Sequence, residues 1–175
     1  STLFPYTTLF RSGRIQQLIE LDIFTDKTKL RMNDRGLIEE IVAYLFYGIT
    51  EKRNAVEELF EAKISEEIAN EKYDRFSLVI NKIFALNDIK PINQTRYKQK
   101  NDFYTLFCFV NEHLEEEFEV LQYQYKILVF ISDNDYISPS NEDCRPFMDY
   151  AINCVSQSNS KRAREMRLQS FERIL

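Results

Sequence analysis

Residues 101–114 read NDFYTLFCFVNEHL, and this stretch has the clearest helical pattern in the chain. Its apolar residues recur at intervals of three and four positions, which is the spacing of one face of an α-helix. They are Phe103, Leu106, Phe107, Val110 and Leu114. Asn101 or Asp102 can cap the start, because a short polar side chain there accepts a hydrogen bond from a free backbone N–H. The stretch therefore predicts a helix that buries an aromatic face.

Segments on both sides of this stretch show the same helical period. Only three glycines and four prolines interrupt the chain, which favours long helices. The further helices that the sequence predicts are residues 13–24, 34–49, 51–63, 65–87, 144–155 and 160–175. Residues 118–131 are ambiguous, because the apolar run KILVFI at 126–131 also fits a buried strand, but no partner strand is visible and we favour a helix. The sequence predicts an all-α fold, an irregular bundle of about seven helices.

The composition limits the cellular setting and the kind of partner. Residues 13–175 are enough for one domain with a core and too few for two, so we expect a single helical domain. The formal net charge of −5 argues against a protein whose whole surface binds nucleic acid. Three widely spaced cysteines, and the lack of a long apolar run after residue 12, predict a reducing, cytoplasmic location.

The first twelve residues differ from the rest of the chain. Thr2–Ser12 (TLFPYTTLFRS) reads like one frame of a common sequencing-library adapter, and it has no helical period. We interpret residues 1–12 as a non-native segment and residues 13–175 as the C-terminal part of a larger protein. The alternative is a short native β-strand or docking arm.

The sequence predicts no catalytic residues and no metal site. A His-Asn-His nuclease or a serine hydrolase needs a placed histidine, and His113, flanked by acids, is the only one and is expected on the surface. The three cysteines form no C-x-x-C pair, so buried free thiols are a better interpretation than zinc ligands. They are Cys108, Cys144 and Cys154.

Three other patterns also fall short of a ligand site. Residues 133–144 begin like a calcium loop but carry Ser138 and Cys144 where glycine and glutamate belong. Glu115–Glu117 and Glu119 could supply paired carboxylates, but consecutive helical positions point in different directions, so a solvated helix junction is favoured. Three glycines cannot build a phosphate-binding loop. The sequence therefore predicts no cofactor.

Two basic clusters are the candidate binding residues. The first, TRYKQKNDFY at 95–104, alternates cations with aromatics before a helix start, where free backbone N–H groups also attract phosphate. The second, SNSKRAREMR at 158–167, gathers cations on one side of a helix start, where they oppose the helix dipole unless an anion or a carboxylate compensates. The predicted nucleic-acid-binding residues in them are Arg96, Lys98, Lys100, Lys161, Arg162, Arg164 and Arg167. The alternative is a charged surface in which Arg96 or Arg164 pairs with nearby glutamates.

Three segments of the chain look like a known family. They are LRMNDRGLIEEIVAYL at 30–45, NQTRYKQKNDFYTLF at 93–107 and SNSKRAR at 158–164. Together they resemble the helical C-terminal portion of the domain of unknown function 262 family, the GmrS-like domain of GmrSD-type restriction systems, over residues 13–175. In that family an R-M-x-D-R-like segment opens the helix that follows the N-terminal ParB-like domain. Here this segment would be Arg31, Met32, Asp34 and Arg35.

The resemblance implies a role in prokaryotic defence against phage or foreign DNA. In the family, a ParB-like domain with an Asp-Gly-Gln-Gln-Arg motif handles nucleotide and a nuclease domain cuts, and this chain contains neither. What carries over is an accessory, non-catalytic domain of a parent protein that would be an NTP-dependent restriction endonuclease. Arg31 and Arg35 then join the residues predicted to contact the DNA backbone or the missing ParB-like domain. The alternatives are a helical protein-interaction or scaffold module without nucleic-acid binding, and an enzyme with a hidden polar pocket.

Overall fold

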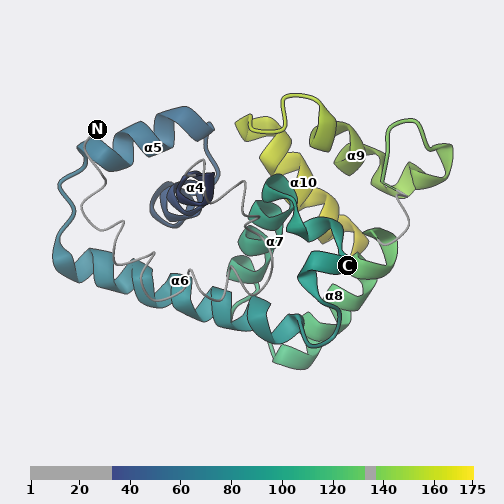
Figure 1. Ribbon diagram of the computed structural model, residues 1–175, viewed down its shortest axis with the longest axis horizontal. Helices are drawn as coiled ribbons and strands as arrows, with labels where there is room; N and C mark the ends of the chain where they lie inside the picture. Colours follow the sequence, from purple (N-terminus) through teal and green to yellow (C-terminus); the bar gives the residue numbers. More distant parts are fainter. Residues whose placement is uncertain (1–32, 133–136) are drawn as a thin grey trace.

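The regular structure of this protein is entirely helical over the residues that the computed structural model describes, 33–132 and 137–175 (Figure 1). This range contains seven α-helices and no strand, which confirms the predicted all-α bundle. None of the described helices is both long and apolar enough to cross a membrane. The predicted helix 13–24, the segment 1–12 and Arg31 lie outside the described residues.

The helices follow the predicted segments closely. The α-helices are α4 (Asn33–Tyr47), α5 (Lys52–Glu61), α6 (Glu66–Leu86), α7 (Lys100–Glu112), α8 (Phe118–Ser132), α9 (Met148–Val155) and α10 (Lys161–Ile174). Short 3-10 helices are η1 (Ile92–Gln94), η2 (Arg96–Lys98) and η3 (Glu142–Phe147). The ambiguous segment 118–131 is helical, as favoured. Gly48 ends α4 with a φ of 73°, a left-handed conformation that suits glycine, and the chain then turns back to pack α5 against α4.

The central helix of the fold is α7, which packs against α4, α6 and α10 (Figure 1). Nine successive residues, Asp102 to Val110, are buried, so α7 is covered on all sides and not on one face only. Phe107 meets Phe76 of α6 with ring centroids 5.8 Å apart, and Phe109 meets Phe171 of α10 edge-on at the same distance. The sequence pattern predicted one buried face of this helix, whereas its neighbours bury all of them.

Serine side chains cap the starts of α6 and α10. Ser65 Oγ accepts a hydrogen bond from the Ile68 N–H at 3.3 Å, and Ser160 Oγ accepts one from the Ala163 N–H at 3.2 Å. The prediction for α7 is wrong, because Gln99 occupies the cap position and gives no side-chain cap. Asp102 lies inside the first turn, where it pairs with another side chain.

Candidate functional site

Arg164 of α10 is buried, and its charge is matched inside the protein. Only 3% of the residue is exposed, and its guanidinium donates to the Glu40 carboxylate on α4 and, at 3.4 Å, to the Thr50 carbonyl. The guanidinium also lies 4.3 Å from the centroid of the Tyr104 ring, in cation–π geometry. The prediction that Arg164 is available to a phosphate is therefore wrong, because Glu40 already supplies the anion that this helix start needs.

Arg167 is fully buried one turn further along α10. Its Nε donates to Thr105 Oγ1 of α7 at 3.0 Å, and its Nη1 donates to the carbonyls of Asn153 and Ser158, each at 2.8 Å. These bonds tie α10 to α7, to α9 and to the connection before α10. The prediction that Arg167 contacts phosphate is therefore also wrong. Arg164 and Arg167 lie on the side of α10 that faces the core.

Arg96 and Asp102 form an ion pair between η2 and α7. The Nε–Oδ1 distance is 3.0 Å, and Asp102, only 2% exposed, also accepts from the Tyr150 hydroxyl of α9. Burial lowers the pKa of Arg96, but Asp102, through its charge and its hydrogen bond and together with Tyr150 and Cys154, outweighs burial, and the pKa is raised overall. Arg96 is therefore paired with an acid of this chain. This agrees with the alternative of a charged surface, except that the acid is Asp102 and not a glutamate.

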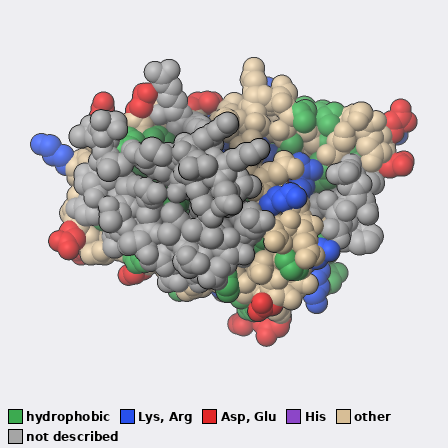
Figure 2. Space-filling model, viewed as in Figure 1, with side chains coloured by type: hydrophobic (Ala, Val, Ile, Leu, Met, Phe, Trp, Pro, Cys, Tyr) green, Lys and Arg blue, Asp and Glu red, His purple; other side chains and the backbone are tan. Residues whose placement is uncertain are grey.

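The other predicted cations are closer to solvent. Lys98, Lys161 and Arg162 are exposed and Lys100 is half-buried, while Arg35 lies in α4 with a side chain outside the described part. Asn101 Nδ2 donates to Ser158 Oγ at 2.9 Å, so the start of α7 lies beside the segment that leads into α10. Figure 2 shows a small group of Lys and Arg side chains in this region. The structure thus brings the two basic clusters together but buries the arginines between them.

The single histidine, His113, is held between two acids and not left on the surface. Its Nδ1 lies 2.8 Å from Glu116 Oε1 and its Nε2 lies 2.7 Å from Glu172 Oε1, while the ring packs 4.4 Å from that of Phe109. Burial lowers the pKa of His113, but the hydrogen bonds to Glu172 and Glu116 outweigh it and raise the pKa. The predicted surface position is corrected to a half-buried one that joins the end of α7 to α10.

The three cysteines are free thiols. Cys108 and Cys144 are buried, as predicted, whereas Cys154 is only half-buried. Burial raises the pKa of Cys154 to about 12, and the neighbouring Asp102 adds to the rise, so this thiol is not ionised at neutral pH. Over residues 33–132 and 137–175, no three His, Cys, Asp or Glu side chains are placed to hold a metal ion.

A groove between α6 and α7 is lined by described residues throughout. It consists of two depressions that share Leu78, which is 55% exposed. The first has a volume of about 690 Å³ and is lined by Tyr44, Leu45, Gly48, Ile49, Glu71, Lys72, Asp74, Arg75, Leu78, Asn111 and Glu112. The second has a volume of about 450 Å³ and is lined by Leu78, Asn81, Lys82, Ala85, Leu114, Glu115 and Phe118. We call the two together the α6–α7 groove.

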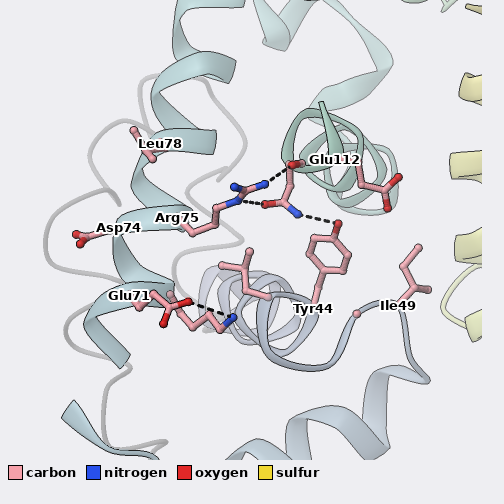
Figure 3. A pocket seen from close by; sticks show the side chains of 11 residues that line it. Tyr44, Ile49, Glu71, Asp74, Arg75, Leu78 and Glu112 are labelled. Carbon is pink, nitrogen blue, oxygen red and sulfur yellow. Dashed lines mark hydrogen bonds and ion pairs between the residues drawn. The ribbon is translucent and has the colours of Figure 1, made fainter. Parts of the chain in front are cut away.

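The floor of the first depression is a fixed set of hydrogen bonds that spans three helices (Figure 3). Arg75 Nε donates to Asn111 Oδ1 at 2.8 Å, and Arg75 Nη2 donates to the Asn111 carbonyl at 2.7 Å. Asn111 Nδ2 in turn donates to the Tyr44 hydroxyl at 3.1 Å. Burial raises the pKa of Tyr44, with a smaller contribution from Cys108, so this hydroxyl stays protonated. These bonds join α6, α7 and α4.

The cations of the groove, Arg75, Lys82 and Lys72, contact acidic or carbonyl groups of this chain. Arg75 Nη1 lies 3.2 Å from Glu115 Oε1, in addition to its two bonds to Asn111. Lys82 donates to the Leu114 carbonyl and, at 3.2 Å, to the Glu116 carbonyl, both in the connection between α7 and α8. Lys72 lies 3.9 Å from Glu71 Oε1. Their charges are thus directed at groups of the protein itself.

The acids of the groove lie on its two walls, with their carboxylates directed away from each other (Figure 3). Asp74 and Glu112 are exposed, and neither carboxylate forms a hydrogen bond or ion pair with another described residue. Figure 3 shows them on opposite sides of the Arg75 side chain, Asp74 on α6 and Glu112 on α7. Burial raises the pKa of Glu112, and the like charge of Glu172 raises it further. The exposed Glu115–Glu117 and Glu119 at the α7–α8 junction, predicted to be solvated, extend this negative charge.

Comparisons with protein-family models, with curated proteins and with solved structures found no match for this chain. The resemblance to the domain of unknown function 262 family therefore stays a prediction. The function has to be argued from the groove and from the positions of the charged side chains.

Proposed function

We propose that this region is a helical protein-interaction module that binds its partner in the α6–α7 groove. The observation that carries the proposal is Leu78, a leucine in the middle of a long helix that stays 55% exposed between two depressions. Half-buried apolar side chains on both sides, Ile49 and Phe118, extend the surface that a partner would cover. Exposed apolar area bounded by polar residues is typical of protein-binding surfaces.

The positions of the arginines favour this interpretation over DNA contact. Phosphate binding depends on cations that can reach the duplex backbone, and each lost contact removes part of the affinity. Arg164 and Arg167 are buried, and Arg96 is paired with Asp102. The exposed cations of the two clusters, Lys98, Lys161 and Arg162, are few for a chain with a net charge of −5.

The test is a selection of peptides that bind the folded chain, followed by NMR mapping of their contact sites on the ¹⁵N-labelled protein. We expect the selected peptides to shift the amide signals of Leu78, Leu114 and their neighbours. Leu78→Asp should abolish binding, whereas Val155→Asp, which alters a 70% exposed residue at the end of α9, should leave it unchanged. Circular dichroism checks that both variants remain folded.

Two results would overturn the proposal. In the first, the selected peptides all map outside the α6–α7 groove and bind Leu78→Asp normally. In the second, duplex DNA binds with an affinity that falls steeply with salt, and replacing Lys98 and Arg162 by alanine lowers the salt slope by about one for each lost contact.

The family resemblance adds a cellular setting to this proposal. We propose that the partner belongs to a restriction protein, with a ParB-like domain as the first candidate. Recovery of the upstream reading frame from the same genomic context tests this setting. An Asp-Gly-Gln-Gln-Arg coding segment there would support it, and an unrelated domain would remove it without affecting the interaction module itself.

A further inference from the structure

The length of the α6–α7 groove fits a partner helix. The lining runs along α6 from Glu71 to Ala85, which is about 21 Å, or about four helical turns, at the rise of an α-helix. The opposite wall is the last turn of α7 together with Leu114 and Phe118. No strand occurs in the part of the chain that the structure describes, so it offers an extended partner no sheet edge to join.

The apolar surface of the groove lies in its middle and at one end. Leu78 separates the two depressions, with Leu114, Ala85 and Phe118 on one side and Ile49 on the other. A helix presents apolar side chains on one face at intervals of three, four and seven residues, so two successive anchors can enter the two depressions on either side of Leu78. The partner that fits this surface is therefore an amphipathic helix.

The rim of the groove determines the charge of that helix. Asp74 and Glu112 are exposed and unpaired among the described residues, and Glu115 is exposed although it contacts Arg75. Figure 2 shows further acidic side chains at the edge of the molecule below the end of α6 and the start of α8. The cations Arg75 and Lys82 are directed at Asn111 and at backbone carbonyls. An anionic partner, including nucleic acid or an anionic lipid surface, would meet repulsion at this rim.

We propose that the α6–α7 groove binds a cationic amphipathic helix, with its apolar face on Leu78 and Phe118 and its Lys or Arg side chains beside Asp74 and Glu112. This inference rests on the proposed function and narrows it to one class of partner. The contacts at the rim set specificity and association rate, while the apolar floor provides most of the affinity.

The experiment uses three fluorescent peptides of about 15 residues, which is about four turns of helix. All three carry the same leucine face, and the polar face carries lysine in the first, glutamine in the second and glutamate in the third. We expect the lysine peptide to bind with a salt-dependent affinity about tenfold above that of the glutamine peptide, and the glutamate peptide not to bind. Leu78→Asp should abolish binding of the lysine peptide.

Matched variants of the protein separate local charge from net charge. Asp74→Asn with Glu112→Gln should weaken binding of the lysine peptide about tenfold, the gain that two exposed ion pairs can supply. Glu61→Gln with Asp88→Asn changes the net charge equally at exposed positions outside the groove, and it should leave the affinity within about twofold. Equal losses in both pairs would mean that only the overall field acts, and the proposed rim contacts would be wrong.

The outcomes distinguish this inference from the function on which it rests. If the glutamine or glutamate peptide binds as tightly as the lysine peptide and Leu78→Asp still abolishes binding, the groove is an interaction site but the cationic partner is wrong. If no peptide binds and selected peptides map elsewhere, both proposals fail. If the chain itself dimerises by analytical ultracentrifugation and Leu78→Asp makes it monomeric, a second copy occupies the groove and the cationic-helix partner is overturned.

Discussion

Replacing Arg164 by methionine is expected to destabilise the protein, because the substitution leaves the Glu40 carboxylate buried without its cation. Arg164 is 3% exposed and Glu40 8% exposed, and removal of one partner of such a pair costs about 3–5 kcal/mol. Loss of the contact with the Tyr104 ring adds to this cost. The Arg164 Nε is buried without a hydrogen-bond partner, which costs desolvation free energy in the native protein. The substitution removes this cost and so offsets part of the destabilisation. We therefore expect the free energy of unfolding to fall by about 3 kcal/mol, near the lower end of that range.

Urea denaturation followed by circular dichroism, arranged as a double-mutant cycle, measures this effect. Glu40→Leu combined with Arg164→Met should recover most of the loss, because an apolar pair of similar volume replaces two buried charges. Arg162→Met is the control, since this exposed neighbour in the same helix turn should change the unfolding free energy by less than about 0.5 kcal/mol. A coupling energy below about 0.5 kcal/mol between Arg164 and Glu40 would refute the reasoning.

Other expectations concern the core, the histidine and the thiols. Phe107→Ala should lower the unfolding free energy by about 3–5 kcal/mol, because the side chain is fully buried. The control Tyr123→Ala, at a 67% exposed position, should change it by less than about 0.5 kcal/mol. A core that tolerates Phe107→Ala would contradict the central position of α7. The contacts of His113 with Glu172 and Glu116 raise its pKa, so the stability they provide is fully present below about pH 6.5 and is lost as the pH rises through the raised pKa. The urea midpoint should therefore fall over this pH interval in the native chain and not in His113→Asn. The single imidazole signal in the proton spectrum follows the same titration, and a pKa at or below the ordinary value would refute the assignment. Cys108 and Cys144 are buried, so mass spectrometry should find them unmodified by a thiol reagent until urea unfolds the protein, and rapid modification of the native chain would show that these parts of the core open.

The helices could be predicted because their signals are local. The spacing of Phe103, Phe107 and Val110 places a helix, and Ser65 and Ser160 mark the starts of two others through contacts only three residues away. The segment 118–131 was ambiguous, because a continuous apolar run fits both periods and the choice depends on neighbours. The structure places this segment as α8, against α6.

The charged side chains could not be assigned from the sequence, because their partners are far along the chain. Glu40 lies 124 positions before Arg164, and Thr105 lies 62 positions before Arg167, so a helical wheel shows a basic side without showing what it faces. From charge alone, these arginines were expected to face solvent or phosphate. In the structure, the buried Glu40 carboxylate balances the charge of Arg164. The Arg96 and Asp102 pair, by contrast, is six positions apart and left a signal that local inspection could find.

The groove was missed for a related reason. Its lining comes from α4, α6 and the segment from the end of α7 to the start of α8, and these three parts are far apart in sequence. One usable signal was present: Leu78 follows Phe76 and Ser77 in α6 but lies away from the apolar stripe of Phe76, Val79, Ile80 and Ile83. A large aliphatic residue off the buried stripe of a helix is a position to examine for partner contact.

The ion pair between Arg164 and Glu40 joins the last described helix to the first. During synthesis on a ribosome, α4 emerges early, and Glu40 cannot form its ion pair with Arg164 until α10 has been made. The same delay applies to α7, since Phe171 and Leu168 of α10 cover part of its aromatic surface. Folding of this chain is therefore a late, whole-length event, in which contacts of high sequence separation form last and the nascent polypeptide keeps an apolar surface uncovered until then.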